Sequence, residues 1–124
     1  MFDHVKFGVS NFEVSKAFYL KALEPLGVTG ITEWPPDGIE IYPLVGDSSL
    51  CLYQTDEKPA HLHIAFVASH RDQVDAFYAA AMDAGAQDNG PPGLRPQYSG
   101  RYYAAFVLDP DGHNIEAVCH EAES

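Results

Sequence analysis

Positive charge is scarce in this 124-residue sequence, which has 7 Lys and Arg residues against 18 Asp and Glu residues. Proteins that bind nucleic acids neutralise phosphates with clustered lysine and arginine side chains. The formal net charge of −11 at pH 7 therefore argues against a nucleic acid partner. The acidic balance favours solubility and carries no information about the fold.

Cysteines and long apolar runs are also scarce. The two cysteines, Cys51 and Cys119, are too few for a disulfide framework, and no Cys-X-X-Cys pair suggests a structural zinc site. No apolar run approaches the roughly 20 residues of a membrane-spanning helix. The first residues lack the basic and apolar regions of a signal peptide. We therefore expect a cytoplasmic protein with no membrane partner.

Hydrophobic residues make up 46% of the chain, enough to bury the core of one compact domain. An internal repeat divides this domain. Residues 4–22 align without a gap on residues 63–81, with seven identities in nineteen positions that include His4 with His63. Chance alone would give roughly one identity. The sequence therefore predicts two copies of one supersecondary unit, at residues about 1–56 and about 60–124.

The first unit is expected to be one strand, one helix and three further strands. Residues 3–9 alternate as a strand, and Ser10 with Glu13 forms a capping box for the helix. The expected buried stripe of this helix consists of Val14, Ala17, Phe18 and Ala22. Turn residues separate the strands expected at 28–34, 39–45 and 50–54.

The second unit repeats this order. It has an expected strand at 61–67, a helix that follows a capping signal at Ser69, and strands at 102–108 and 113–120 around an Asp-Pro-Asp-Gly turn. Residues 86–101 are rich in Gly and Pro and are expected to be a loop that begins with one short strand. The prediction is an α+β fold of two paired βαβββ modules.

Three residues that suit a metal site fall on equivalent sides of their strands. His4, His63 and Glu116 each alternate with apolar neighbours that would face the helices. Imidazole and carboxylate groups suit Mn, Fe, Co, Ni or Zn, and three such ligands leave positions open for substrate. A strand histidine is more often structural or exposed, and an alternating glutamate is usually solvated. The repeat favours the metal interpretation, because two histidines at corresponding positions can meet across a pseudo-twofold axis.

Several motifs resemble a known family over nearly the whole chain. They are Asp3-His4-Val5, residues 15–19 and 63–66, and most specifically residues 106–116, where a hydrophobic strand and Asp-Pro-Asp-Gly precede a strand with a central Glu. These motifs resemble the vicinal oxygen chelate superfamily, which includes glyoxalase I, extradiol dioxygenases, and fosfomycin- and bleomycin-resistance proteins. Residues 88–103 resemble a glyoxalase-like branch of unassigned substrate. The resemblance implies an incomplete barrel around a central metal cavity.

The resemblance also implies a ligand set. His4, His63 and Glu116 would hold a divalent metal, and Glu116 would also be the catalytic carboxylate. Glyoxalase I usually has a further carboxylate on the fourth strand, where this chain has Cys51 or Tyr53. We interpret Cys51 as a buried thiol in preference to a soft ligand.

The expected function is a small metal-dependent enzyme of the lyase, isomerase or dioxygenase type. Its metal would act as a Lewis acid on a small oxygen-bearing substrate. A homodimer is expected as well, because family members commonly pair and an incomplete barrel leaves sheet edges to cover. The alternative function is a metal-free protein that sequesters a small aromatic or cationic compound, as bleomycin-resistance proteins do. The acidic charge and the many tyrosines suit that alternative, whereas the set of His4, His63 and Glu116 favours the enzyme.

Five residues are further candidates for substrate contacts. Lys6 shares the His4 side of its strand, and Arg95 offers a fork of donors that can bind a carboxylate with two hydrogen bonds. The other three are Cys51, Tyr53 and Tyr103, of which the tyrosines are expected either in an aromatic pocket or in the core.

Overall fold

The computed structural model of the chain describes residues 2–57 and 61–121. Its helices are α1 (Phe12–Leu23), the short 3-10 helix η1 (Glu24–Leu26) and α2 (Arg71–Asp83). Its strands are β1 (His4–Val9), β2 (Val28–Trp34), β3 (Gly38–Pro43), β4 (Ser49–Gln54), β5 (His63–Val67), β6 (Gln87–Asp88), β7 (Gly93–Leu94), β8 (Tyr103–Leu108) and β9 (Asn114–Cys119). The expected α+β architecture is confirmed, and β6 and β7 are short strands within the segment expected to be mainly loop.

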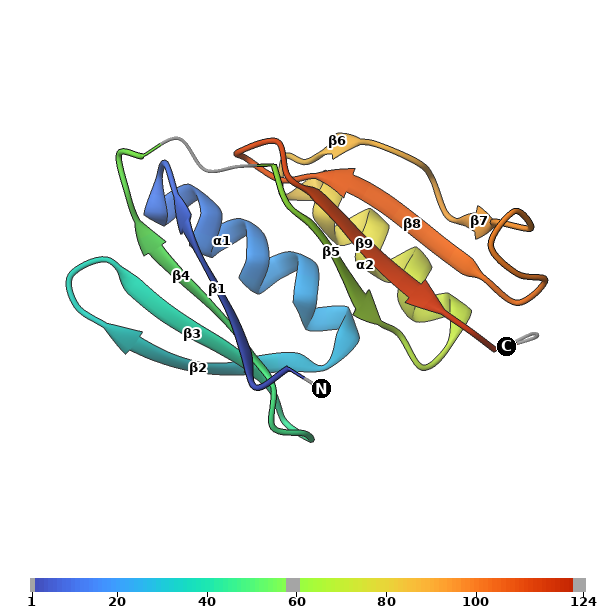
Figure 1. The fold of residues 1–124 in the computed structure, drawn as a ribbon, viewed down its shortest axis with the longest axis horizontal. Coiled ribbons are helices and arrows are strands. Elements are labelled where there is room, and N and C mark those ends of the chain that lie inside the picture. The colour runs from blue at the N-terminus through green and yellow to red at the C-terminus, as the bar shows by residue number, and fades with distance from the viewer. Residues whose placement is uncertain (1, 58–60, 122–124) are drawn as a thin grey trace.

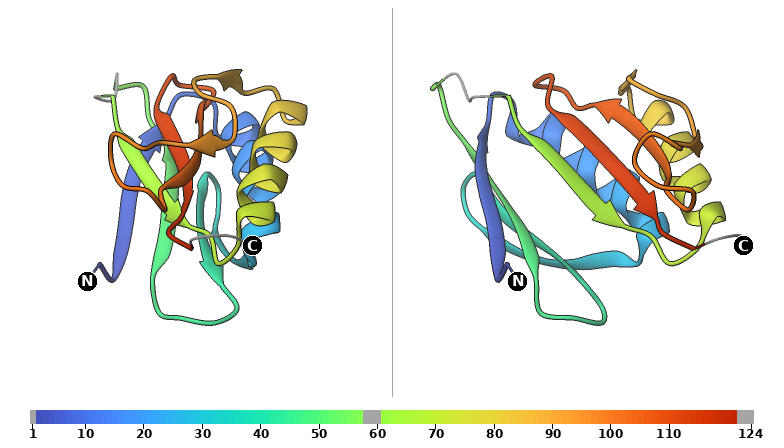
Figure 2. Two further views of the ribbon diagram at one scale, coloured as in Figure 1. Left: turned by 90° about the vertical axis from the view of Figure 1, so that its right-hand side faces the viewer. Right: turned by 45° about the vertical axis from the view of Figure 1, so that its right-hand side comes forward.

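Each half of the chain forms its own sheet. The strand order is β1-β4-β3-β2 in the first sheet and β5-β9-β8-β6 in the second, where β7 also pairs with β8. The β1–β4 and β5–β9 pairs are parallel and the other pairs are antiparallel. Both helices lie on the same side of the two sheets, as Figures 1 and 2 show. We call the side without helices the open face.

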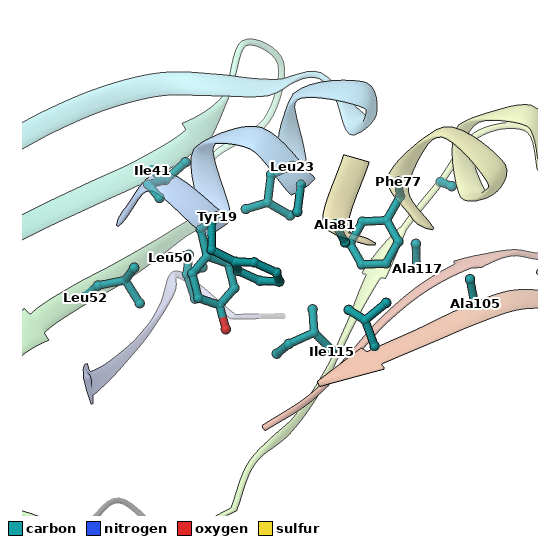
Figure 3. Packing of buried hydrophobic residues seen from close by; sticks show 14 of the residues in the cluster. Tyr19, Leu23, Ile41, Leu50, Leu52, Phe77, Ala81, Ala105, Ile115 and Ala117 are labelled. Atoms are coloured by element: carbon teal, nitrogen blue, oxygen red, sulfur yellow. The ribbon is translucent and has the colours of Figure 1, made fainter. Parts of the chain in front are cut away.

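One continuous core joins the two halves. It lies between the helices and the sheets and includes buried residues of α1, α2 and strands of both sheets. Figure 3 shows Tyr19 and Leu23 of α1 on one side of this cluster and Phe77 and Ala81 of α2 on the other. Because the halves share a core, their relative placement within the chain is fixed by packing. Among the described residues, no helix is long and apolar enough to cross a membrane.

The start of α1 differs from the expected capping box. Asn11 is the N-cap, and its side chain accepts a hydrogen bond from the Val14 amide at 3.2 Å. The hydroxyl group of Ser10 instead donates to Asp111 in the second half of the chain.

The face of α1 that packs on the core also differs from the expected stripe. The expectation for Phe18 and Ala22 is confirmed, but Val14 is 48% exposed and Ala17 is also exposed. In their place Ser15 and Tyr19 pack inward, and together with Phe18 and Ala22 they have the three- and four-residue spacing of one helical face. Helix α2 likewise begins after His70, which forms a capping box with Gln73, and not after Ser69.

Candidate functional site

The centre of the candidate site is a carboxylate on the open face of the second sheet. Glu116 lies in the middle of β9, and its side chain is 1% exposed. Its Oε1 atom lies 2.8 Å from Nε2 of His63, which stands on the neighbouring parallel strand β5. The His63 side chain is 55% exposed, so the pair joins a buried carboxylate to an imidazole that solvent reaches.

Tyr102, one residue before β8, is the second partner of this carboxylate. Its hydroxyl group donates a hydrogen bond to Oε2 of Glu116. Burial, together with the hydrogen bond and the charge of Glu116, raises the pKa of Tyr102 to about 12. The tyrosine is therefore a neutral donor near pH 7. A buried carboxylate is costly unless both of its oxygens have partners, and His63 and Tyr102 supply them.

The structure brings together two of the three predicted ligands. His4 lies on β1 of the first sheet, its side chain is 52% exposed, and its Nδ1 atom lies 2.8 Å from Asp3. Within residues 2–57 and 61–121, no three His, Cys, Asp or Glu side chains lie close enough together to hold a metal ion. His4 is therefore apart from His63 and Glu116 within one chain, because the shared core holds the two sheets in this arrangement.

The donor pair itself fits a metal ion. Two ligand atoms that each lie about 2.1 Å from one ion, at right angles to one another, are about 3.0 Å apart. The 2.8 Å between His63 Nε2 and Glu116 Oε1 is close to that spacing. Imidazole nitrogen and carboxylate oxygen are donors that suit Fe, Mn, Co, Ni and Zn. His63 and Glu116 thus fit two adjacent positions around such an ion.

The strand registers identify the counterpart of Glu116 in the first sheet. His4 pairs with Ser49 as His63 pairs with Asn114. Two residues further along, Cys51 takes the place of Glu116. Cys51 is buried, and its pKa is raised chiefly by desolvation, which disfavours the thiolate form that a metal would need.

An aromatic patch with one cation covers part of the open face of the first sheet. The Nζ atom of Lys6 lies 5.7 Å from the ring centroid of Trp34 and 5.4 Å from that of Tyr53. Trp34 and Tyr53 are 42% and 41% exposed. Gly38 leaves room for Trp34, because a Cβ atom there would lie 3.2 Å from the indole ring. Trp34 is not among the substrate candidates predicted from the sequence, although its alternation with Thr32 along β2 is the signal that places it on this face.

The remaining two substrate candidates lie on different sides of the second sheet. Tyr103 faces α2, where its hydroxyl group donates to Asp75 at 2.6 Å and Arg71 lies over its ring. It is therefore not beside His63 and Glu116. Arg95 lies with its guanidinium group 5.3 Å from the ring centroid of Phe106, which pairs with Glu116 across β8 and β9. A shallow hollow elsewhere on the molecule is lined by α1 and Ala84 and includes none of these residues.

Comparisons with known proteins identify the family and the fold of the chain. A family model described as the Glyoxalase/Bleomycin resistance protein/Dioxygenase superfamily matches residues 1–117. A glyoxalase/bleomycin resistance protein from Albidiferax ferrireducens T118 is 29% identical with a TM-score of 0.81, and the match covers 97% of this chain and 98% of that one. None of the curated proteins matches the sequence.

Two more distant structures share the fold. A lactoylglutathione lyase from Agrobacterium tumefaciens is 15% identical with a TM-score of 0.72, over 96% of this chain and 92% of that one. A glyoxalase/bleomycin resistance protein/dioxygenase family enzyme from Burkholderia phytofirmans PsJN is 17% identical with a TM-score of 0.72, over 96% and 98% of the chains. At these identities the likeness concerns the fold alone.

Proposed function

The chain belongs to the glyoxalase/bleomycin resistance protein/dioxygenase superfamily, and on that basis we propose that it is a metal-dependent enzyme. Its metal site would join His63 and Glu116 of one copy with His4 of a second copy. The observation that carries the proposal is the buried Glu116 carboxylate, which meets the half-exposed His63 imidazole on the open face. Because the His63 side chain is 55% exposed, an ion from solvent can reach its nitrogen beside the Glu116 oxygen.

A second copy of the chain is the proposed source of the third ligand. Large apolar side chains are exposed on the open faces, with Trp34 at 42%, Tyr53 at 41% and Val67 at 76%. Exposed apolar groups clustered on one face are typical of protein interfaces. A homodimer that covers these faces would bring the His4 strand of one copy toward the His63 strand of the other.

The residues of such a site have separate roles. His4, His63 and Glu116 would hold the ion, which supplies Lewis acidity to an oxygen atom of the substrate. The hydroxyl group of Tyr102 fixes Oε2 of Glu116, so that Oε1 is the oxygen directed at His63. Glu116 is then the group that can accept a proton from the substrate next to the polarised oxygen. The enzyme would be of the lyase, isomerase or dioxygenase type, and the substrate a small oxygen-bearing molecule.

Metal content tests the proposal directly. Protein purified without a histidine tag is incubated with Mn, Fe, Ni and Zn salts and desalted, and its bound metal is measured. We expect about one equivalent per chain in the wild type and less than about a tenth in His63→Ala. His61→Ala is the matched control, because His61 is an exposed histidine two residues earlier, and it should retain the metal. Wild-type protein with less than about a tenth of an equivalent would overturn the proposal.

A second candidate function is a metal-free binding protein. The aromatic patch of Lys6, Trp34 and Tyr53 favours it, because exposed rings can bind a planar or cationic compound without a metal. The same measurement separates the two functions, since a binding protein of this kind would take up no metal in either the wild type or His63→Ala.

A further inference from the structure

The backbone of Arg95 is fixed by three hydrogen bonds. Its amide donates to the Tyr102 carbonyl at 2.7 Å, and its own carbonyl accepts from the amides of Tyr98 and Ser99. Strand β7 immediately before it pairs with β8. Arg95 therefore stands at a defined position beside β8, although it lies in a segment rich in Gly and Pro.

The guanidinium group of Arg95 is also held in place, by two hydrogen bonds and an aromatic ring. Its Nη2 atom donates to the Pro91 carbonyl at 2.7 Å and its Nη1 atom to the Leu94 carbonyl at 3.4 Å, while its face lies against Phe106. The two glycines of the Gly-Pro-Pro-Gly segment leave the necessary space. A Cβ atom on Gly90 or on Gly93 would lie 3.1 Å from Nη2 or Nη1 respectively. The loop thus encloses one orientation of the guanidinium group.

In the part of the chain that the structure describes, no carboxylate forms an ion pair with the Arg95 guanidinium group. Arg95 takes part in none of the ion pairs found among residues 2–57 and 61–121. The basic partners in those pairs are Lys16, Lys21 and three histidines. Two of the five guanidinium N–H groups bond to carbonyls, which leaves three for another acceptor.

Phe106 connects Arg95 to the candidate site. Phe106 pairs with Glu116 in the sheet, and its ring centroid lies 6.2 Å from that of His63. The guanidinium group of Arg95 therefore lies against the Phe106 ring, and the His63 imidazole lies near the same ring. A small molecule bound at His63 and Glu116 can extend along this ring toward Arg95.

We propose that Arg95 forms a carboxylate-binding subsite, so that the substrate of this site is a small molecule carrying a carboxylate group. The inference rests on the proposed function for the position of the reacting centre. The subsite itself rests on the surroundings of Arg95. A pre-oriented guanidinium group binds a carboxylate through two parallel hydrogen bonds and selects it over neutral groups of similar shape.

Titration with benzoate and benzamide, which have similar shapes and differ in charge, tests the subsite. Binding is followed through the backbone amide NMR signals of Gly90, Gly93 and Phe106, in metal-loaded and in chelator-treated protein. We expect benzoate to bind at least about ten-fold more tightly than benzamide in both preparations. Arg95→Gln should weaken benzoate binding about ten-fold or more, while Arg101→Gln, an exposed arginine of the same segment, should leave it unchanged.

Arg95→Lys separates anion binding from a role limited to holding the loop. It keeps the charge and loses the planar fork, so its affinity for benzoate should fall between those of the wild type and Arg95→Gln. Equal binding of benzoate by the wild type and Arg95→Gln, or no preference for benzoate over benzamide, would overturn the inference. Metal content measured on the same samples reports separately on the proposed function, because Arg95→Gln is expected to retain the metal.

Discussion

At the scale of single residues, Tyr102 controls how the Glu116 carboxylate is held. Replacement of Tyr102 by Phe removes the donor to Oε2 and leaves a buried carboxylate oxygen without that partner. We expect a loss of about 1–3 kcal/mol in the free energy of unfolding, measured with urea at pH 7. Tyr98→Phe is the matched control, because Tyr98 lies beside Tyr102 with a ring distance of 4.9 Å and is 62% exposed. Equal stability of Tyr102→Phe and wild type would contradict this role.

The contribution of the Tyr102–Glu116 hydrogen bond to the free energy of unfolding depends on pH. The pKa of Tyr102 is raised from 10.0 to about 12, so folding favours the protonated hydroxyl group. Its stabilising contribution is fully present below about pH 10 and is lost as the pH rises toward about 12. The difference in stability between the wild type and Tyr102→Phe should therefore narrow across this range.

Single residues also show which contacts of the candidate site can be predicted from a sequence pattern. Alternation along two strands placed His63 and Glu116 on one face, and their contact follows from the parallel pairing of β5 with β9. Tyr102 was not predicted as a partner of Glu116, because alternation along a strand does not show which residue of a neighbouring strand reaches the carboxylate. The side of the sheet on which Tyr103 lies depends on which face of β8 packs on α2, and the sequence alone is compatible with either face.

At the scale of elements, the repeat predicted the order of helices and strands but not the helix starts. Ser10 and Ser69 occupy equivalent positions in the repeat, and both have the chemistry of an N-cap. In the structure Asn11 and His70 cap the helices instead. The hydroxyl group of Ser10 donates a hydrogen bond to Asp111 in the Asp-Pro-Asp-Gly turn. A local sequence motif does not reveal such a contact between distant parts of the chain.

Substitution at the helix start distinguishes the two N-cap assignments. Asn11→Ala removes the side-chain acceptor of the Val14 amide and should lower the free energy of unfolding by about 1 kcal/mol. Ser69→Ala should change it by less than about 0.5 kcal/mol, because α2 is capped by His70 and Gln73. Urea unfolding of both variants measures these effects. A larger loss in Ser69→Ala than in Asn11→Ala would contradict the observed caps.

At the scale of the whole molecule, the two halves make different contributions. The second sheet carries the His63–Glu116–Tyr102 cluster and Arg95, whereas the first carries His4 and the aromatic patch around Lys6. A pseudo-twofold relation within the sequence is equally compatible with ligands that meet inside one chain and with ligands that meet between two copies. The sequence therefore predicted the two sheets, while the common core that fixes their placement became visible only in the structure.

This separation of the ligands leads to a complementation experiment with two variants, His4→Ala and His63→Ala. Each variant alone should lack the metal, because every site in its dimer has lost one ligand. When the two are unfolded together and refolded in equal amounts, about half of the dimers should contain one chain of each kind. In such a dimer His4 of one chain meets His63 and Glu116 of the other, so one of its two sites is intact. Metal content should then recover to about a quarter of the wild-type value.

A site built within one chain would recover no metal content, since each chain lacks one ligand. Failure of the mixture to exceed the separate variants, with wild-type protein refolded in parallel and retaining its metal, would contradict a site shared between copies.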